Sequence, residues 1–88
     1  MPKEHPQKQP LTIVVGGTKT EVERNDNAPL GSVVGVALAQ THNTGQPAEN
    51  WELKDQAGNV LDLKKKIGEY NFPSNVVLFL SLKAGIGG

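Results

Sequence analysis

The first segment of the chain that can form a strand is rich in apolar and β-branched residues. Residues 11–15 are β-branched or apolar, with Leu, Ile and Val at every second position, which predicts a strand with one buried face. Gly16 and Gly17 then predict a tight hairpin turn, because glycine accepts positive φ without strain. Residues 18–24 predict the returning strand, with Thr20 and Val22 on its inner face.

A different period follows, in which apolar residues recur at spacings of three and four. This pattern runs over residues 30–41 and predicts one helix of about four turns, started by Pro29. Gly31 and Gly35 lie within it and weaken it by about 1 kcal/mol each relative to alanine. We expect these two glycines to allow close approach of the helix to a sheet.

The second half of the chain predicts three more strands. Residues 51–54 predict a short strand, 55–59 a turn, and 60–61 a brief returning strand. Residues 64–72 predict a short helical turn followed by a loop. The continuous apolar run at 76–82 predicts a strand in the middle of the sheet, because such runs are typical of strands buried on both faces.

The predicted element order is therefore β-β-α-β-β-β, an α+β fold in which one helix packs on a mixed sheet. Residues 10–83 make up the predicted domain. Residues 1–9 contain no large apolar side chain after Met1, so we expect a flexible N-terminal extension. Residues 84–88 end in Gly-Gly, and we expect them to form a flexible C-terminal tail.

Composition narrows the class of protein. The 88 residues fit one small domain, and the absence of cysteine excludes disulfides, thiolate metal ligands and a cysteine nucleophile. A reducing cytoplasm is the expected location, because small secreted domains usually need cross-links. Nine basic residues balance nine acidic ones, which argues against a general nucleic-acid binder. No apolar run approaches the ~20 residues that a membrane helix needs.

Several residues in the last third of the chain resemble those of ubiquitin. Leu61-Asp62, Ile67 and Tyr70-Asn71-Phe72 stand at the spacing of a similar stretch in ubiquitin. Two leucines of the last strand and the basic residue before the tail also have counterparts there, namely Leu78, Leu80 and Lys83. Together with the strand order and the terminal Gly-Gly, these residues make the chain similar to the ubiquitin-like β-grasp family. The resemblance implies a divergent, prokaryotic ubiquitin-like modifier.

The departures from ubiquitin fall on its apolar recognition surface. Glu52 and Lys54 stand where ubiquitin exposes an isoleucine, and Ser81 stands where it exposes a valine. Phe79 would replace part of that patch, so these four residues form the expected partner surface. Asn59 lies near the place of a main chain-linking lysine, which puts formation of chains in doubt.

The resemblance also implies that the working part of the chain is its C-terminal tail. The carboxylate of Gly88, ionised at neutral pH, would attack the α-phosphorus of ATP on an activating enzyme. The acyl-adenylate would pass to a thiol and then to an amine or hydroxyl of a target. Gly87 and Gly88 are expected to enter a narrow cleft that side chains would obstruct. Residues implied in tail recognition are Lys83, Ala84, Gly85 and Ile86.

The partners implied by the resemblance are an activating enzyme, a conjugating enzyme, a processing or deconjugating peptidase, and target proteins. The chain itself would be no enzyme and would need no cofactor. One alternative is a sulfur carrier of the thiamine- or molybdopterin-synthesis type, with a thiocarboxylate on the same glycine. Those proteins place an Asp-Gly-Asp-like turn before the last strand, where this chain has Phe72-Pro73-Ser74-Asn75. Another alternative is a non-conjugated binding module that uses the sheet face around Phe79.

Other conspicuous residues have simpler interpretations. His5 and His42 each stand alone, without a carboxylate or nucleophile at a meaningful spacing, so neither predicts a catalytic or metal site. The basic run at 64–66 is typical of a solvated turn, with a charged contact to a partner enzyme as the alternative. Trp51 is either an exposed recognition residue or a cap on the edge of the core. Tyr70 resembles a structural tyrosine of ubiquitin, whose hydroxyl binds nearby backbone.

Overall fold

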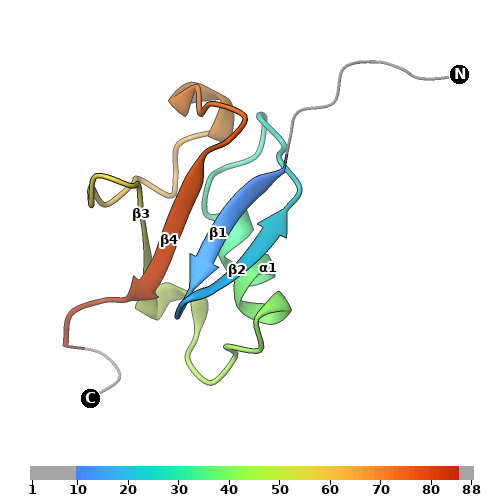
Figure 1. Cartoon of the computed structure of the whole chain (residues 1–88). Coiled ribbons are helices and arrows are strands. Elements are labelled where there is room, and N and C mark those ends of the chain that lie inside the picture. The colour runs from blue at the N-terminus through green and yellow to red at the C-terminus, as the bar shows by residue number, and fades with distance from the viewer. Residues whose placement is uncertain (1–9, 86–88) are drawn as a thin grey trace, which may run out of the picture.

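The computed structural model describes residues 10–85, which form a four-stranded sheet, one α-helix and two short 3₁₀-helices (Figure 1). The strands are β1 (Leu11–Val15), β2 (Thr18–Val22), β3 (Trp51–Lys54) and β4 (Val77–Leu82). The helix is α1 (Ser32–Gln40), and the 3₁₀-helices are η1 (Ala48–Asn50) and η2 (Ile67–Tyr70).

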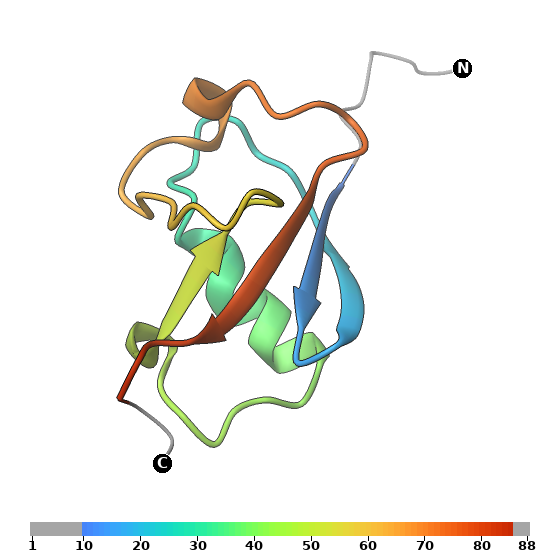
Figure 2. The ribbon, with the colours of Figure 1, turned by 60° about the vertical axis from the view of Figure 1, so that its left-hand side comes forward.

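The strands of the sheet lie in the order β2-β1-β4-β3. β1 is antiparallel to β2 and parallel to β4, whereas β3 is antiparallel to β4. A parallel pair needs a crossover connection, and α1 lies on that path, packed across one face of the sheet (Figure 2). This arrangement confirms the predicted α+β, β-grasp fold with one helix on a mixed sheet, and it confirms that the apolar last strand lies in the middle.

The core lies between α1 and the sheet. One face of each strand supplies it, and the helix contributes its inner stripe. The largest side chains with less than 2% exposure are Leu11, Ile13, Leu30, Leu53, Ile67, Leu78, Val15 and Val33. Each such side chain contributes about 1.5–3 kcal/mol through removal from water. The opposite face of the sheet has no layer over it within residues 10–85.

The predicted glycine hairpin is present between β1 and β2. Gly16 has φ +56° and Gly17 has φ +85°, the left-handed pair that a two-residue type I′ turn requires. β2 ends at Val22 rather than at residue 24 as the sequence predicts. Val22 pairs with Leu11, the first residue of β1, so the ladder between the two strands ends there.

The predicted fifth strand at residues 60–61 is wrong. Val60 forms only an isolated bridge with Lys54, and the N–H of Leu61 donates to the carbonyl of Leu53 at 2.8 Å. The chain then leaves the sheet, and its backbone instead bonds to the segment before α1. The carbonyl of Leu63 accepts a hydrogen bond from the N–H of Gly31 at 2.9 Å, at the start of α1.

The helix is shorter than predicted and begins at Ser32. Pro29 forms an isolated bridge with Lys66, and the N–H of Leu30 donates to the carbonyl of Lys65 at 2.8 Å, so the chain is paired with a distant loop just before α1. The expected close approach of two glycines to the sheet is also wrong. A Cβ on Gly31 would lie 3.2 Å from Leu63, in the loop between β3 and β4, and one on Gly35 would meet nothing within 4 Å.

Candidate functional site

The exit of the C-terminal tail is fixed at the end of β4. The N–H of Lys83 donates to the carbonyl of Asn50 at 2.8 Å, and Asn50 directly precedes β3. The Asn50 side chain in turn donates from Nδ2 to Oε1 of Gln46 at 2.8 Å. The last strand is therefore held to its neighbour up to the residue at which the tail begins.

Beyond this anchor the described part of the tail faces solvent. Lys83, Ala84 and Gly85 are all exposed, and Gly85 has φ +86°, a left-handed conformation that favours glycine. The remaining predicted tail residues, Ile86, Gly87 and Gly88, lie outside the described residues. The predicted extension at residues 1–9, which includes His5, also lies outside them.

Trp51 lies beneath the tail exit rather than on the surface. It pairs with Leu82 in the β3–β4 ladder, belongs to the core cluster and is 8% exposed. Its indole Nε1 is buried and has no hydrogen-bond partner among residues 10–85. Of the two interpretations of this tryptophan, the structure therefore supports the cap on the core edge.

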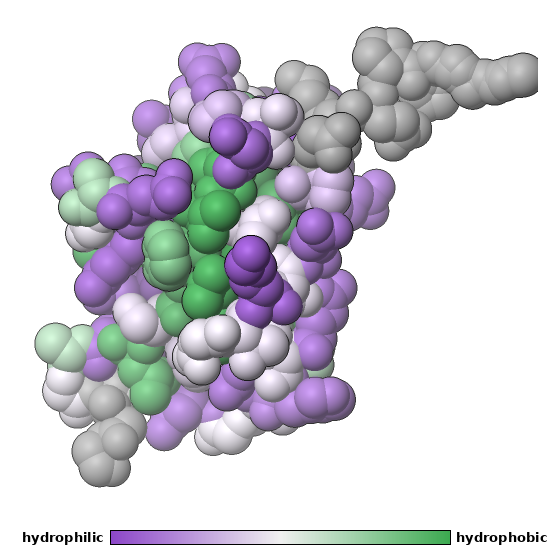
Figure 3. Space-filling view, in the orientation of Figure 1, coloured by the Kyte–Doolittle hydropathy of each residue, from purple (hydrophilic) through white to green (hydrophobic). Residues whose placement is uncertain are grey.

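The uncovered face of the sheet carries an apolar stripe. Cross-strand pairing places Phe79 between Val14 and Lys54, and Val77 lies two residues along on the same face. Phe79 is 39% exposed, and both valines are half-buried. Figure 3 shows the resulting green band over β4 and β1.

Polar side chains flank this stripe on the β3 side. Ser81 pairs with Glu52, and the Glu52 carboxylate lies 3.3 Å from Nζ of Lys54. The four residues of the expected partner surface therefore share one face of the sheet. Val14 and Val77 are not among the four predicted residues, although the period of two in β1 assigns Val14 to the face opposite the core.

The segment between β3 and β4 is built around Tyr70. Its hydroxyl donates to the carbonyl of Asp62 and accepts from the N–H of the same residue, each at 2.8 Å. The ring stacks on Phe72 with centroids 5.0 Å apart, and Nζ of Lys65 lies 4.6 Å from its centre. Tyr70 is therefore structural, and one lysine of the basic run packs on its own domain.

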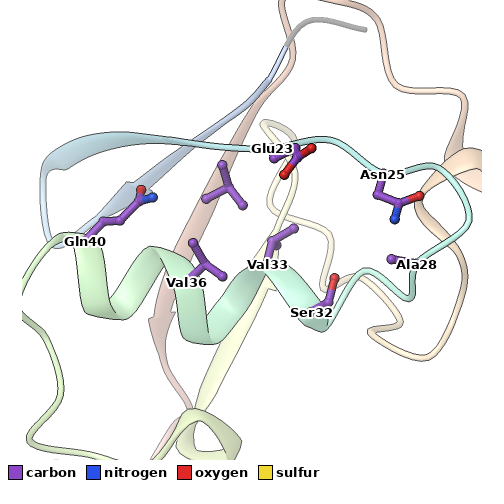
Figure 4. Close-up of a pocket in the computed structure, with 8 residues that line it drawn as sticks. Glu23, Asn25, Ala28, Ser32, Val33, Val36 and Gln40 are labelled. Carbon is purple, nitrogen blue, oxygen red and sulfur yellow. The ribbon is translucent and has the colours of Figure 1, made fainter. Parts of the chain in front are cut away.

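A groove between β2 and α1 was not predicted from the sequence. Its volume is about 480 Å³, and Figure 4 shows the residues that line it. Valines form its floor and polar side chains its rim, and the lining residues are Val22, Glu23, Asn25, Ala28, Ser32, Val33, Val36 and Gln40. Thr20 Oγ1 donates to Gln40 Oε1 at one end. Val36 is 43% exposed, so the groove presents apolar surface beside an edge strand.

The described residues contain little that resembles a catalytic or metal site. No group of three or more His, Asp or Glu side chains within residues 10–85 is arranged to hold a metal ion. The backbone N–H of Asn59 donates to the exposed Asp55 carboxylate, and this hydrogen bond holds the pKa of Asp55 below its ordinary value of 3.8. This carboxylate organises a turn. Within the same residues, no helix is long and apolar enough to cross a bilayer.

Two comparisons concern the sequence. Residues 4–88 match the model of a family described as "Protein of Unknown function (DUF2604)". A Sinorhizobium fredii protein described as "Uncharacterized protein y4jI" is 53% identical over 83 residues, which are 94% of this chain and 64% of that protein. The chain therefore spans less than two thirds of the length of this relative.

Comparison with solved structures identifies the fold. A ubiquitin from Caldiarchaeum subterraneum superposes with a TM-score of 0.70 at 22% identity, over 91% of this chain and 98% of its own. A protein designed on the basis of ubiquitin gives 0.72 at 21% identity, over 96% and 99%. ATBAG1, solved in complex with HSP70, gives 0.70 at 14% identity, over 88% of this chain but 41% of its own. These likenesses show a ubiquitin-like β-grasp fold.

Proposed function

We propose that this chain, which belongs to the DUF2604 family, is a ubiquitin-like protein modifier conjugated through Gly88. Gly88 bears the reactive carboxylate either directly or after a processing peptidase has cut behind it. The observation that carries the proposal is the exit of the chain from a ubiquitin-like domain. The N–H of Lys83 is anchored to Asn50, and the chain that follows is exposed at Ala84 and Gly85.

The proposed chemistry uses this chain as a substrate. A carboxylate oxygen of Gly88 attacks the α-phosphorus of ATP on an activating enzyme, and pyrophosphate leaves. A thiolate then attacks the acyl carbon and AMP leaves. Finally an amine or hydroxyl of the target attacks the thioester, and the thiolate leaves. The modifier supplies only the acyl group and the surface that partner enzymes recognise, so it is not itself a catalyst.

The rigid exit and the flat sheet face support different parts of this proposal. The hydrogen bond at Lys83 fixes the point on the domain at which the tail begins. The stripe around Phe79, flanked by the Glu52–Lys54 ion pair and Ser81, gives partner enzymes an apolar centre with a polar rim. We propose that these residues form the surface at which activating and conjugating enzymes dock.

The test is formation of a thioester in a defined reaction. The chain is incubated with its cognate activating enzyme and ATP, and we expect a covalent adduct that a thiol reductant releases. A variant without Gly87 and Gly88 should form none, whereas a variant without Pro2 and Lys3 loses the same number of residues and should react normally. Full reaction of the variant without the two glycines would refute the proposal.

A second candidate is a non-conjugated binding module, favoured by the apolar stripe on the open sheet face. In one structural neighbour, ATBAG1, the matched region makes up 41% of the solved chain, so the fold there is one part of a longer protein. This candidate predicts that deletion of Gly87 and Gly88 leaves activity in cells unchanged, while Phe79→Ala abolishes it. Val36→Ala is the matched control, because Val36 is 43% exposed and lies on α1, which covers the opposite face of the sheet.

Intact mass separates both candidates from a sulfur carrier. Protein purified from its own cells should carry an ordinary carboxylate, together with conjugates joined through Gly88. Replacement of one oxygen at Gly88 by sulfur would instead identify a thiocarboxylate, and the modifier proposal would fail.

A further inference from the structure

The two edges of the sheet differ in what covers them. The outer side of β3 is partly occupied, because Val60 bridges Lys54 and the N–H of Leu61 donates to the carbonyl of Leu53. The outer side of β2 pairs with nothing among residues 10–85. An uncovered edge strand presents free N–H and C=O groups that can pair with another strand.

The hairpin determines which backbone groups of β2 point outward. A two-residue type I′ turn closes with a hydrogen-bonded pair, here Val15 and Thr18. Hydrogen-bonded and non-bonded pairs alternate along an antiparallel ladder, so Thr18, Thr20 and Val22 direct their backbone groups toward β1. The free N–H and C=O groups at the outer edge therefore belong to Lys19 and Glu21.

The side chains of these same two residues are opposite in charge. Lys19 and Glu21 are exposed, lie on the uncovered face of the sheet, and form no ion pair within residues 10–85. If β2 pairs antiparallel with a second β2 about a dyad at Thr20, each Lys19 lies directly opposite Glu21 of the other copy. The backbone groups of the same pairs then face one another, as hydrogen-bonded pairs require.

We propose that β2 is a self-association edge, through which two copies of this chain join their sheets into one. The dyad passes through Thr20, whose own backbone groups are directed toward β1. A register shifted by two residues would place Lys19 opposite Lys19 of the second copy, or Glu21 opposite Glu21. Like charges directly opposite are unfavourable. The charge order of β2 therefore selects both the partner, which is a second copy, and the register.

The groove between β2 and α1 is compatible with pairing of β2 to the β2 strand of a second copy. Val36 and Gln40 line it on the helix, one turn apart, and the second copy brings its own helix to the same side of the joined sheet. A strand of five residues makes a small interface, and such interfaces are weak. We therefore expect a dimer with a Kd on the order of 0.1–1 mM at low salt.

Charge reversal tests this inference by sedimentation equilibrium of the 88-residue chain. Lys19→Glu and Glu21→Lys each place like charges in both cross-strand pairs and should weaken the dimer by about tenfold or more. An equal mixture of the two single variants should associate again, because one copy is then acidic and the other basic. The double variant Lys19→Glu/Glu21→Lys should dimerise like the original chain.

Matched controls keep the same change in net charge. Lys64→Glu and Glu49→Lys alter exposed residues away from β2, Glu49 lying in η1 beside the other edge of the sheet, and should leave the Kd unchanged. The inference is overturned if the chain stays monomeric at millimolar concentration, or if the single reversals do not weaken association. Failure of both the mixture and the double variant to restore association also overturns it, provided far-ultraviolet circular dichroism shows that they are folded.

Discussion

Replacing Tyr70 with phenylalanine removes one oxygen atom from the bridge that ties η2 to the chain around Asp62. That oxygen takes part in two hydrogen bonds, each 2.8 Å long. A protein hydrogen bond contributes about 0.5–1.5 kcal/mol net. Asp62 is exposed and Tyr70 is half-buried, so water partly replaces both bonds, and we expect a loss of about 1–2 kcal/mol in the free energy of unfolding.

Urea denaturation followed by the fluorescence of the single tryptophan measures this loss. For a domain of this size the same change corresponds to roughly 5–10 °C in Tm. The control is Lys65→Met, which removes the cation 4.6 Å from the same ring and leaves the hydroxyl in place. We expect it to cost about 0.5 kcal/mol or less. Equal losses for Tyr70→Phe and Lys65→Met would refute the assignment of the hydroxyl as the structural bridge.

Three further predictions concern the core, the glycines and pH. Leu78→Ala, at a fully buried position of β4, should lower the free energy of unfolding by about 2–5 kcal/mol in urea. Gly68→Ala should cost about 1–3 kcal/mol, since a Cβ there would lie 3.0 Å from a neighbouring side chain; Gly35→Ala, with nothing within 4 Å, should instead raise the melting temperature. The hydrogen bond from the N–H of Asn59 lowers the pKa of Asp55 below 3.8. The ionised Asp55 carboxylate therefore stabilises the folded chain fully above pH 3.8, and this stabilisation is lost as the pH falls through the lowered pKa. Urea midpoints of the original chain and Asp55→Asn should therefore differ more at pH 7 than at about pH 2.5.

The elements predicted well from the sequence are those governed by local chemistry. Gly16 and Gly17 define the hairpin wherever the rest of the chain lies, because few other residues adopt positive φ at two successive positions. The continuous apolar run of the last strand likewise predicts a strand with neighbours on both sides, as β4 has. These two features, together with the helical period between them, are sufficient for the fold class.

The elements predicted poorly depend on partners distant in sequence. Leu30 and Gly31 fit a helical period, but this segment pairs with a distant loop through the bridge of Pro29 with Lys66, and α1 begins only at Ser32. The same contact draws the chain off the sheet after Val60 and removes the predicted fifth strand. No pattern within either segment reports a hydrogen bond that joins them.

The candidate site also combines features that the sequence predicts with features that depend on contacts between distant segments. Alternation assigns Phe79, Ser81, Glu52 and Lys54 to outward positions, and antiparallel pairing of β3 with β4 places them on one face of the sheet. The groove beside β2 depends on how α1 crosses the sheet, which the helical period does not determine. The tail anchor also joins two segments, because Lys83 binds the backbone of Asn50.

The tail exit and the self-association edge occupy different parts of the sheet. β4 is two strands from β2, a separation of about 10 Å at 4.8 Å per strand. β4 runs parallel to β1, so its tail leaves at the hairpin end of the sheet, and the dyad carries the partner's tail to the opposite end. The two tail exits at Lys83 of the proposed dimer therefore lie at opposite ends of the joined sheet. Deletion of Gly87 and Gly88 should abolish thioester formation and leave the dimer Kd unaltered, so that either proposal can fail while the other stands.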